Sequence, residues 1–135
     1  MSKSAIYTVN NTTQVVAVDG QINLGSVIRR FGCNCHLNNN AINITGSGYY
    51  DIDASFTIAP TADGEVTVTM YKDGIAVPGA VATETVAAAG DSANLSISSL
   101  VREFCPCCDN SSNLTFVLSG VESNVTNVAI VVEKL

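Results

Sequence analysis

The sequence is poor in charge and contains no tryptophan. Only 13% of the 135 residues are charged, and six lysines and arginines stand against twelve aspartates and glutamates, for a formal net charge of −6. Nucleic-acid binding depends on a basic surface, and the single basic doublet, Arg29-Arg30, is too small to provide one. The composition therefore argues against a nucleic-acid partner. Asn, Ser, Thr and Gly must cover much of the surface, or partners must bury it.

Long hydrophobic runs are also missing. No segment approaches the roughly 20 apolar residues of a membrane helix. The start, Met1-Ser2-Lys3-Ser4, lacks the apolar core of a secretory signal. We therefore expect no membrane partner and no secretion signal.

Catalytic motifs are absent as well, because the glycines fall at turns and no phosphate loop, serine elbow or HExxH pattern occurs. His36 is the sole histidine and has no orienting acid nearby in the sequence. Asp51 and Asp53 lie two apart on one strand face, as a cation site or a glycosidase pair would need. A solvated strand face is the commoner explanation. We therefore expect that the chain is not an enzyme.

What the sequence does contain is a series of short alternating segments. Between 49 and 59, apolar residues from Tyr50 to Ile58 fall on one face and polar residues on the other. Turn signals such as Asp19-Gly20 and Asp73-Gly74 separate the segments. About ten strands with this spacing predict an all-β, antiparallel sandwich or barrel. We expect one domain over 14–135, with residues 1–13 as an N-terminal arm or an edge strand.

The last strand differs from the others because it is apolar on both faces. Val128-Ala129-Ile130-Val131-Val132 shows no polar residue before Glu133. One face can enter the core of the chain, since side chains alternate across a strand. The other face needs a second cover, and a copy of the same chain is the simplest one. The sequence thus predicts self-assembly.

Two segments resemble a known family. Gly48-Tyr49-Tyr50 opens a long strand, and the next strand ends in Met70-Tyr71-Lys72-Asp73-Gly74. This order is similar to the complement C1q and tumour-necrosis-factor-like jelly roll. The resemblance implies a single antiparallel jelly-roll sandwich, a homotrimer, and a binding or structural role without catalysis. The C-terminal strand would face the three-fold axis, and the predicted interface residues are Val15, Ala17, Tyr49, Ala129, Val131 and Leu135.

The whole chain also resembles small structural proteins of bacteriophages and prophages of Gram-positive gut bacteria. Asn11-Thr12, Arg29-Arg30-Phe31-Gly32-Cys33 and the Cys-rich stretch 105–108 carry this likeness. It implies a virion protein made in the bacterial cytoplasm: a capsid decoration, a head fibre or a fibre knob. Its partners would be the major capsid protein or other virion proteins, contacted by the segment before Gln14. The alternative is a carbohydrate- or receptor-binding surface module that recognises a host-surface glycan.

Five cysteines leave one chemical question open, because an odd number cannot all pair internally. Free thiols, a structural metal, or disulfides formed after release into an oxidising medium would each fit. No cofactor is expected apart from that metal. In the jelly-roll strand order, the strands after the two cysteine loops start at opposite ends, which counts against one shared site in a protomer. The candidate ligands are Cys33, Cys35, His36, Cys105, Cys107 and Cys108.

Overall fold

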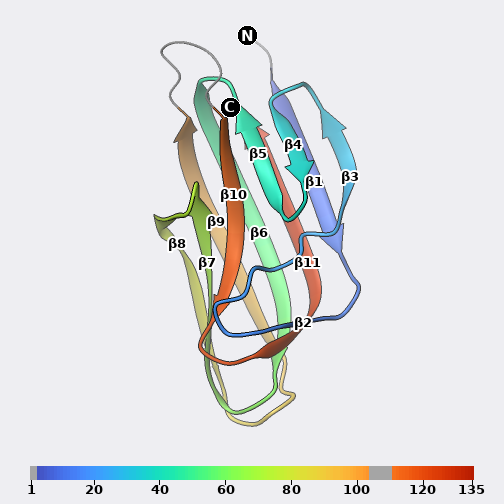
Figure 1. Ribbon diagram of the computed structural model, residues 1–135, viewed down its shortest axis with the longest axis vertical. Helices are drawn as coiled ribbons and strands as arrows, with labels where there is room; N and C mark the ends of the chain where they lie inside the picture. The colour runs from blue at the N-terminus through green and yellow to red at the C-terminus, as the bar shows by residue number, and fades with distance from the viewer. Residues whose placement is uncertain (1–2, 104–110) are drawn as a thin grey trace.

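A computed structural model describes residues 3–103 and 111–135 of the chain. These residues form eleven β-strands in two antiparallel sheets that pack face to face (Figure 1). No helix long and apolar enough to cross a membrane occurs among them. The predicted all-β antiparallel sandwich is confirmed, with eleven strands where about ten were expected.

Six strands make up sheet A, in the order β3–β1–β11–β6–β9, with β2 also paired to β11. Strand β11 therefore lies between β1 and β6 along most of its length. The bounds of the strands are β1 (Ser4–Asn10), β2 (Gln14–Val16), β3 (Ser26–Phe31), β6 (Gly48–Pro60), β9 (Ala93–Glu103) and β11 (Ser123–Lys134).

Five strands make up sheet B, in the order β4–β5–β10–β7–β8. Strand β8 is an edge strand, a position that tolerates its Pro78-Gly79 interruption. The bounds are β4 (Cys35–Asn38), β5 (Ala41–Thr45), β7 (Gly64–Lys72), β8 (Ile75–Val86) and β10 (Ser111–Ser119).

The core lies between the two sheets and is built from the alternating residues of their facing strands. In β6, Ile52 and Ile58 are fully buried, whereas Asp53 and Ser55 between them are exposed. Across the core, the ring of Phe56 lies 5.4 Å from that of Phe116 in β10, centroid to centroid. Burial of one such side chain contributes roughly 1.5–3 kcal/mol. These inward faces therefore hold the two sheets together.

The N-terminal segment is part of the sandwich rather than an arm. We expected an arm or an edge strand over residues 1–13, but β1 lies between β3 and β11. Ile6 and Thr8 are buried on its inner face, so the core needs this strand. Strand β2 continues along the same side of β11, opposite Ser123–Val125, and β1 covers the part from Val128 onward.

The first cysteine segment, which the sequence suggested to be a loop before the next strand, contains strand β4. Cys35 pairs with Ile44 of β5, and Ile44 pairs with Ser112 of β10. Strands β5 and β10 are antiparallel neighbours, as predicted. The expectation that the cysteine loops lie at opposite ends is nevertheless wrong for Cys35. The β4–β5 hairpin returns Cys35 to the end of the sheet where β10 begins.

Candidate functional site: the outer face of sheet A

The outer face of sheet A is the side that sheet B does not cover. On this face Val131 of β11 lies between Tyr7 of β1 and Asp53 of β6. Val131 keeps 38% of its surface exposed, and Tyr7 keeps 36%. The alternate residues of β11, such as Ile130, are buried in the core. The second apolar face predicted for the C-terminal strand is therefore present and uncovered in the single chain.

Five of the six residues predicted for the interface fall along this face. Val15 alternates with the buried Val16 in β2, and Ala129 and Val131 alternate with buried residues of β11. Tyr49 is exposed at the start of β6, and its C=O accepts a hydrogen bond of 2.9 Å from the N–H of Leu135. Their contact with another copy stays a prediction.

Ala17, the sixth residue predicted for the interface, does not lie on a strand face. Strand β2 ends at Val16, and the C=O of Ala17 accepts a hydrogen bond of 2.9 Å from the N–H of Gly20. The turn signalled by Asp19-Gly20 thus begins earlier than the alternating pattern suggested.

Sequence reasoning missed three apolar residues on the same face: Tyr7, Phe31 and Leu100. Phe31 is 59% exposed and Leu100 57% exposed. The register places both in one row across the sheet, which runs through Ala5, Glu133 and Asp51. Tyr7 was detectable, because it alternates with Ile6 and Thr8 on a period of two.

Carboxylates and small polar residues occupy the middle of this face. Asp51 lies directly opposite Glu133, and Asp53 accepts a hydrogen bond of 2.8 Å from the hydroxyl of Ser98. Beside Val131, a shallow hollow of about 300 Å³ is lined mainly by Asp53, Ser98 and other small residues of β6 and β9. The face is therefore mixed: exposed apolar side chains such as Tyr7, Val131 and Leu100 lie around a polar and acidic patch made by Asp51, Asp53, Ser98 and Glu133.

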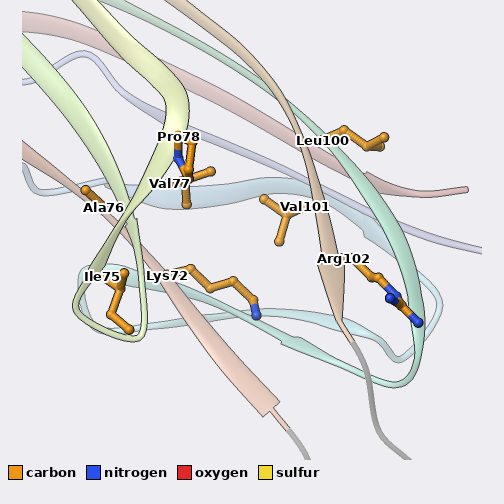
Figure 2. A pocket seen from close by; sticks show the side chains of 8 residues that line it. All are labelled: Lys72, Ile75, Ala76, Val77, Pro78, Leu100, Val101 and Arg102. Atoms are coloured by element: carbon orange, nitrogen blue, oxygen red, sulfur yellow. The ribbon is translucent and has the colours of Figure 1, made fainter.

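A groove runs along the edge of the sandwich where β8 passes beside β9. Figure 2 shows Ile75 and Pro78 on one side and Leu100 and Arg102 on the other. Its volume is about 290 Å³. Ile75 is 74% exposed, so the groove has an apolar rim. Its described lining includes Lys72 and Arg102 but no aromatic ring and no carboxylate.

The cysteines of the first segment differ from each other in their surroundings. Cys33 is exposed, whereas Cys35 is completely buried. Burial raises the pKa of the Cys35 thiol from its ordinary 9.0 to about 11, although the positive charges of Arg30 and Lys134 act in the opposite direction. A thiol must lose its proton to bind a metal, so Cys35 is a poor ligand in this position.

His36 already has a partner at each ring nitrogen. Arg30 can only donate, so Nδ1 of His36 accepts its hydrogen bond. Nε2 then carries the proton and donates to the C=O of Cys33 at 3.1 Å. Within 3–103 and 111–135, no group of three His, Cys, Asp or Glu residues could hold a metal. Cys105, Cys107 and Cys108 lie outside the described residues, so the metal hypothesis stays a prediction.

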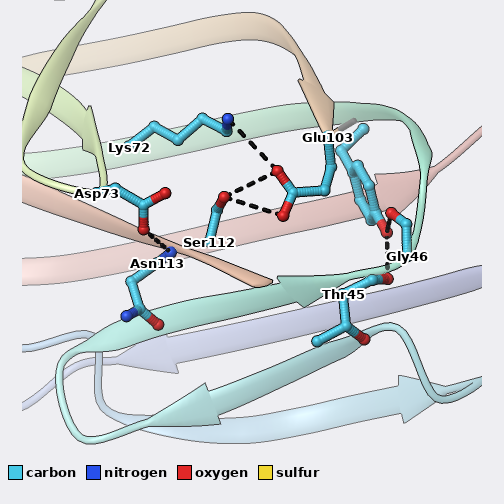
Figure 3. Close-up of polar contacts among 8 residues, drawn as sticks. Thr45, Gly46, Lys72, Asp73, Glu103, Ser112 and Asn113 are labelled. Carbon is cyan, nitrogen blue, oxygen red and sulfur yellow. Dashed lines mark hydrogen bonds and ion pairs between the residues drawn. The ribbon is translucent and has the colours of Figure 1, made fainter. Parts of the chain in front are cut away.

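The buried carboxylate of Glu103 connects the two sheets near the end of the sandwich where Cys35 lies. Glu103, only 4% exposed, ends β9 of sheet A and accepts hydrogen bonds of 2.8 and 3.0 Å from the hydroxyl of Ser112 in sheet B (Figure 3). The Nζ of Lys72 lies 3.4 Å from the same carboxylate. An unpaired buried carboxylate would be costly, and these partners offset that cost. The group is structural, since each of its contacts joins strands.

Tyr50 anchors the neighbouring turn from inside the core. Its hydroxyl lies 2.6 Å from the C=O of Thr45 and 3.0 Å from that of Gly46, to which it donates. Burial, together with Cys35 and Glu103, raises the pKa of Tyr50 from 10.0 to about 12. The hydroxyl therefore stays protonated and serves as a donor.

Comparisons with known proteins identify the fold. No family model matches the chain, and no curated protein sequence is similar to it. Among solved structures, murine APRIL matches with a TM-score of 0.73 at 8% identity, over 99% of this chain and 100% of its own. The globular domain of zebrafish complement 1qA matches with a TM-score of 0.68 at 7% identity, over 97% and 94%. The PRD1 vertex protein P5 matches with a TM-score of 0.65 at 15% identity, over 98% and 96%.

Identities this low establish the fold and nothing finer. The strand order and the likeness to murine APRIL and to the complement 1qA domain show that the fold is a jelly roll of the C1q and tumour-necrosis-factor type.

Proposed function

We propose that this chain is a non-enzymatic structural protein of a virion and works as a homotrimer, as a capsid decoration, a head fibre or a fibre knob. The uncovered apolar part of sheet A, around Tyr7 and Val131, carries the proposal. Transfer of apolar surface out of water favours association by roughly 25 cal/mol per Å² before the costs of binding. Every solution of the protein contains further copies of the chain, so a second copy is always available to cover this apolar surface.

The position of the apolar surfaces supports a closed ring. One surface lies on the outer face of sheet A, and another lies at the β8–β9 edge, where Ile75 is exposed and Leu100 of the outer face borders the groove. A contact between two different surfaces is heterologous, and it closes when the rotation between copies completes a circle. Three copies are what the jelly-roll resemblance implies.

The oligomeric state can be measured directly by light scattering. The wild-type chain should show about three times its mass of 14.0 kDa. Val131→Asp should give monomers, because it adds a charge in the middle of the apolar surface. Val18→Asp is the matched control, since Val18 is 48% exposed but lies outside β2 and β11. A monodisperse wild-type monomer, or an intact Val131→Asp trimer, would contradict the interface.

The virion role needs a separate test, and the likeness to a vertex protein supports it. Particles of the phage or prophage that encodes the chain should be purified and their proteins quantified by mass spectrometry. We expect the chain at a fixed copy number per particle, divisible by three. Its absence from purified particles would contradict the virion role while leaving the trimer intact. A glycan module would instead need an aromatic and acidic groove, which the β8–β9 groove does not provide.

A further inference from the structure

Strand β3 leaves one edge of sheet A open. It pairs with β1 on one side only, and all six of its residues are exposed. Within the described residues, no backbone hydrogen bond from Ser26–Phe31 goes to any strand but β1. An edge of this kind presents N–H and C=O groups that can pair with another strand.

The remaining edges are better protected, and the free side of β2 is only three residues long. Strand β8 is interrupted by Pro78 and by Gly79, which has a φ of +82°. Strand β4 is only four residues long, and β9 has β8 packed beside it. Proline, short length and a covering strand are the usual means of blocking an edge. Strand β3 has none of these three, although its pairing with β1 is irregular at Ile28 and two of its six residues are arginines.

The charge around β3 is opposite to that of the chain as a whole. From Gly20 to Tyr50 the sequence has no acidic residue, although the chain contains twelve. Arg29, Arg30 and the exposed Lys3 are three of its six basic residues. Arg30 is directed toward β4, where it binds the C=O of Cys35 and the ring of His36. Arg29 lies beside Tyr7 on the outer face and is available to a ligand on that side.

An apolar hollow adjoins the same strand. It has a volume of about 130 Å³, and its lining includes Tyr7, Arg29, Phe31 and Val131. Added strands gain affinity from main-chain hydrogen bonds and specificity from places for alternate side chains. This site offers a place for one apolar side chain and a cation for one acidic side chain.

We propose that β3 binds an extended, acidic segment of a second protein as an additional strand of sheet A. A second copy of β3 is a poor occupant, because antiparallel self-pairing would bring four arginines into one ladder without an acid. Arg29 and the hollow lie on the same outer face, so a segment with Glu and Val two positions apart, on one face of the added strand, meets both requirements. The hydrogen-bonding edge of β3 lies apart from the trimer surface, since β1 separates β3 from β11, but Tyr7 and Val131 belong both to that surface and to the lining of the hollow.

A designed peptide tests the site without knowledge of the natural partner. The probe is acetyl-TETVTET-amide, which has both glutamates and the valine on one face, and its control carries lysine in place of both glutamates. Binding to the full chain is followed by fluorescence anisotropy of labelled peptide and by amide hydrogen exchange. We expect the acidic peptide to bind and to slow exchange in 26–31, and the lysine peptide to bind at least tenfold more weakly. N-methylation of alternate amides in the acidic peptide should abolish binding.

Charge-swap variants separate strand pairing at β3 from general electrostatics. Arg29→Glu should weaken binding of the acidic peptide about tenfold and make the lysine peptide the better ligand. The control is the double variant Thr85→Glu, Ala87→Glu, which makes the same change of net charge at exposed positions of the opposite edge. It should leave both affinities within twofold. No exchange protection at millimolar peptide, protection outside β3, or an unchanged preference in Arg29→Glu would overturn the proposal.

The trimer proposal and the added-strand proposal can be refuted separately. The effect of Val131→Asp is measured as the mass of the assembly, and the effect of Arg29→Glu is measured as the preference between the two peptides. A wild-type monomer that still binds the acidic peptide would end the trimer proposal and leave the β3 site standing.

Discussion

Cys35 should be almost unreactive toward alkylation in the folded protein. Burial raises its pKa to about 11. At pH 8, about one part in a thousand of such a thiol is ionised, against about one part in ten at the ordinary value. Because the thiolate is the nucleophile, this shift alone predicts a rate about 100-fold below that of an ordinary exposed thiol. Complete burial of the side chain slows it further.

The assay is alkylation with iodoacetamide at pH 8, followed by digestion and mass spectrometry of each cysteine peptide. Cys33 is exposed and three residues from His36, so it serves as the reference in the same molecule. In 8 M urea the two rates should come within a few-fold of each other, because unfolding removes the burial. Equal rates in the native protein would refute the placement of Cys35 in the core.

The result also bears on the cysteine hypotheses. A slow Cys35 cannot take part in a metal site or a disulfide while the fold is intact, because both need the thiolate. Fast reaction at both positions would reopen Cys33 and Cys35 as a pair of ligands.

Three further predictions concern stability, each measured by urea unfolding. Thr8→Val should raise the free energy of unfolding by about 1 kcal/mol, because Oγ1 of Thr8 is buried without a partner among the described residues; a lower midpoint would contradict this. Folding raises the pKa of Cys35 and Tyr50 to about 11 and about 12, so their stabilising contribution is complete below pH 9 and is lost as the pH rises through those values. A flat profile from pH 8 to pH 11 would disprove that coupling. Ser112→Ala should cost about 1–3 kcal/mol, because it removes a donor from a buried carboxylate, whereas Ala at the exposed Ser111 should change little.

The long strands could be read from the sequence because their pattern is local. Over β6, every second side chain from Tyr50 to Ile58 enters the core, and the period of two is sufficient to predict both the strand and its buried face. The same holds for β11, where apolar residues on both faces correctly predicted one buried and one uncovered face. Neither prediction needed the identity of the neighbouring strands.

The positions of β1 and β4 depend on pairing with distant residues, and no local pattern reports that. No feature of Ser4–Asn10 indicates that β11, more than a hundred residues later, is its neighbour. Strand β4 did carry a usable signal that was overlooked. Asn39-Asn40 forms the two-residue turn to β5, with Asn39 at a φ of +55°. Asparagine is one of the few residues that accept this conformation in a hairpin turn.

The same limit applied to the candidate site. The exposed face of Val131 could be predicted, but Tyr7 and Asp53 beside it could not, because their places follow from the order of the strands. A sequence pattern gives the face of a strand. Only the topology tells which faces join into one surface.

The strand order also relates the two proposed contacts to each other. Neighbouring strands lie about 4.8 Å apart, so β3 is about 10 Å from β11, and Tyr7 of β1 lies between Arg29 and Val131 on the outer face. Tyr7 therefore borders both the apolar surface of the trimer and the hollow beside β3. Replacement of Tyr7 by Ser should weaken both trimer assembly and peptide binding. Val131→Asp should affect mainly trimer assembly, and Arg29→Glu should affect mainly peptide binding. If Tyr7→Ser altered only one of the two contacts, the surfaces would not be adjacent in the assembly, and the added strand would have to bind through the backbone edge and Arg29 alone.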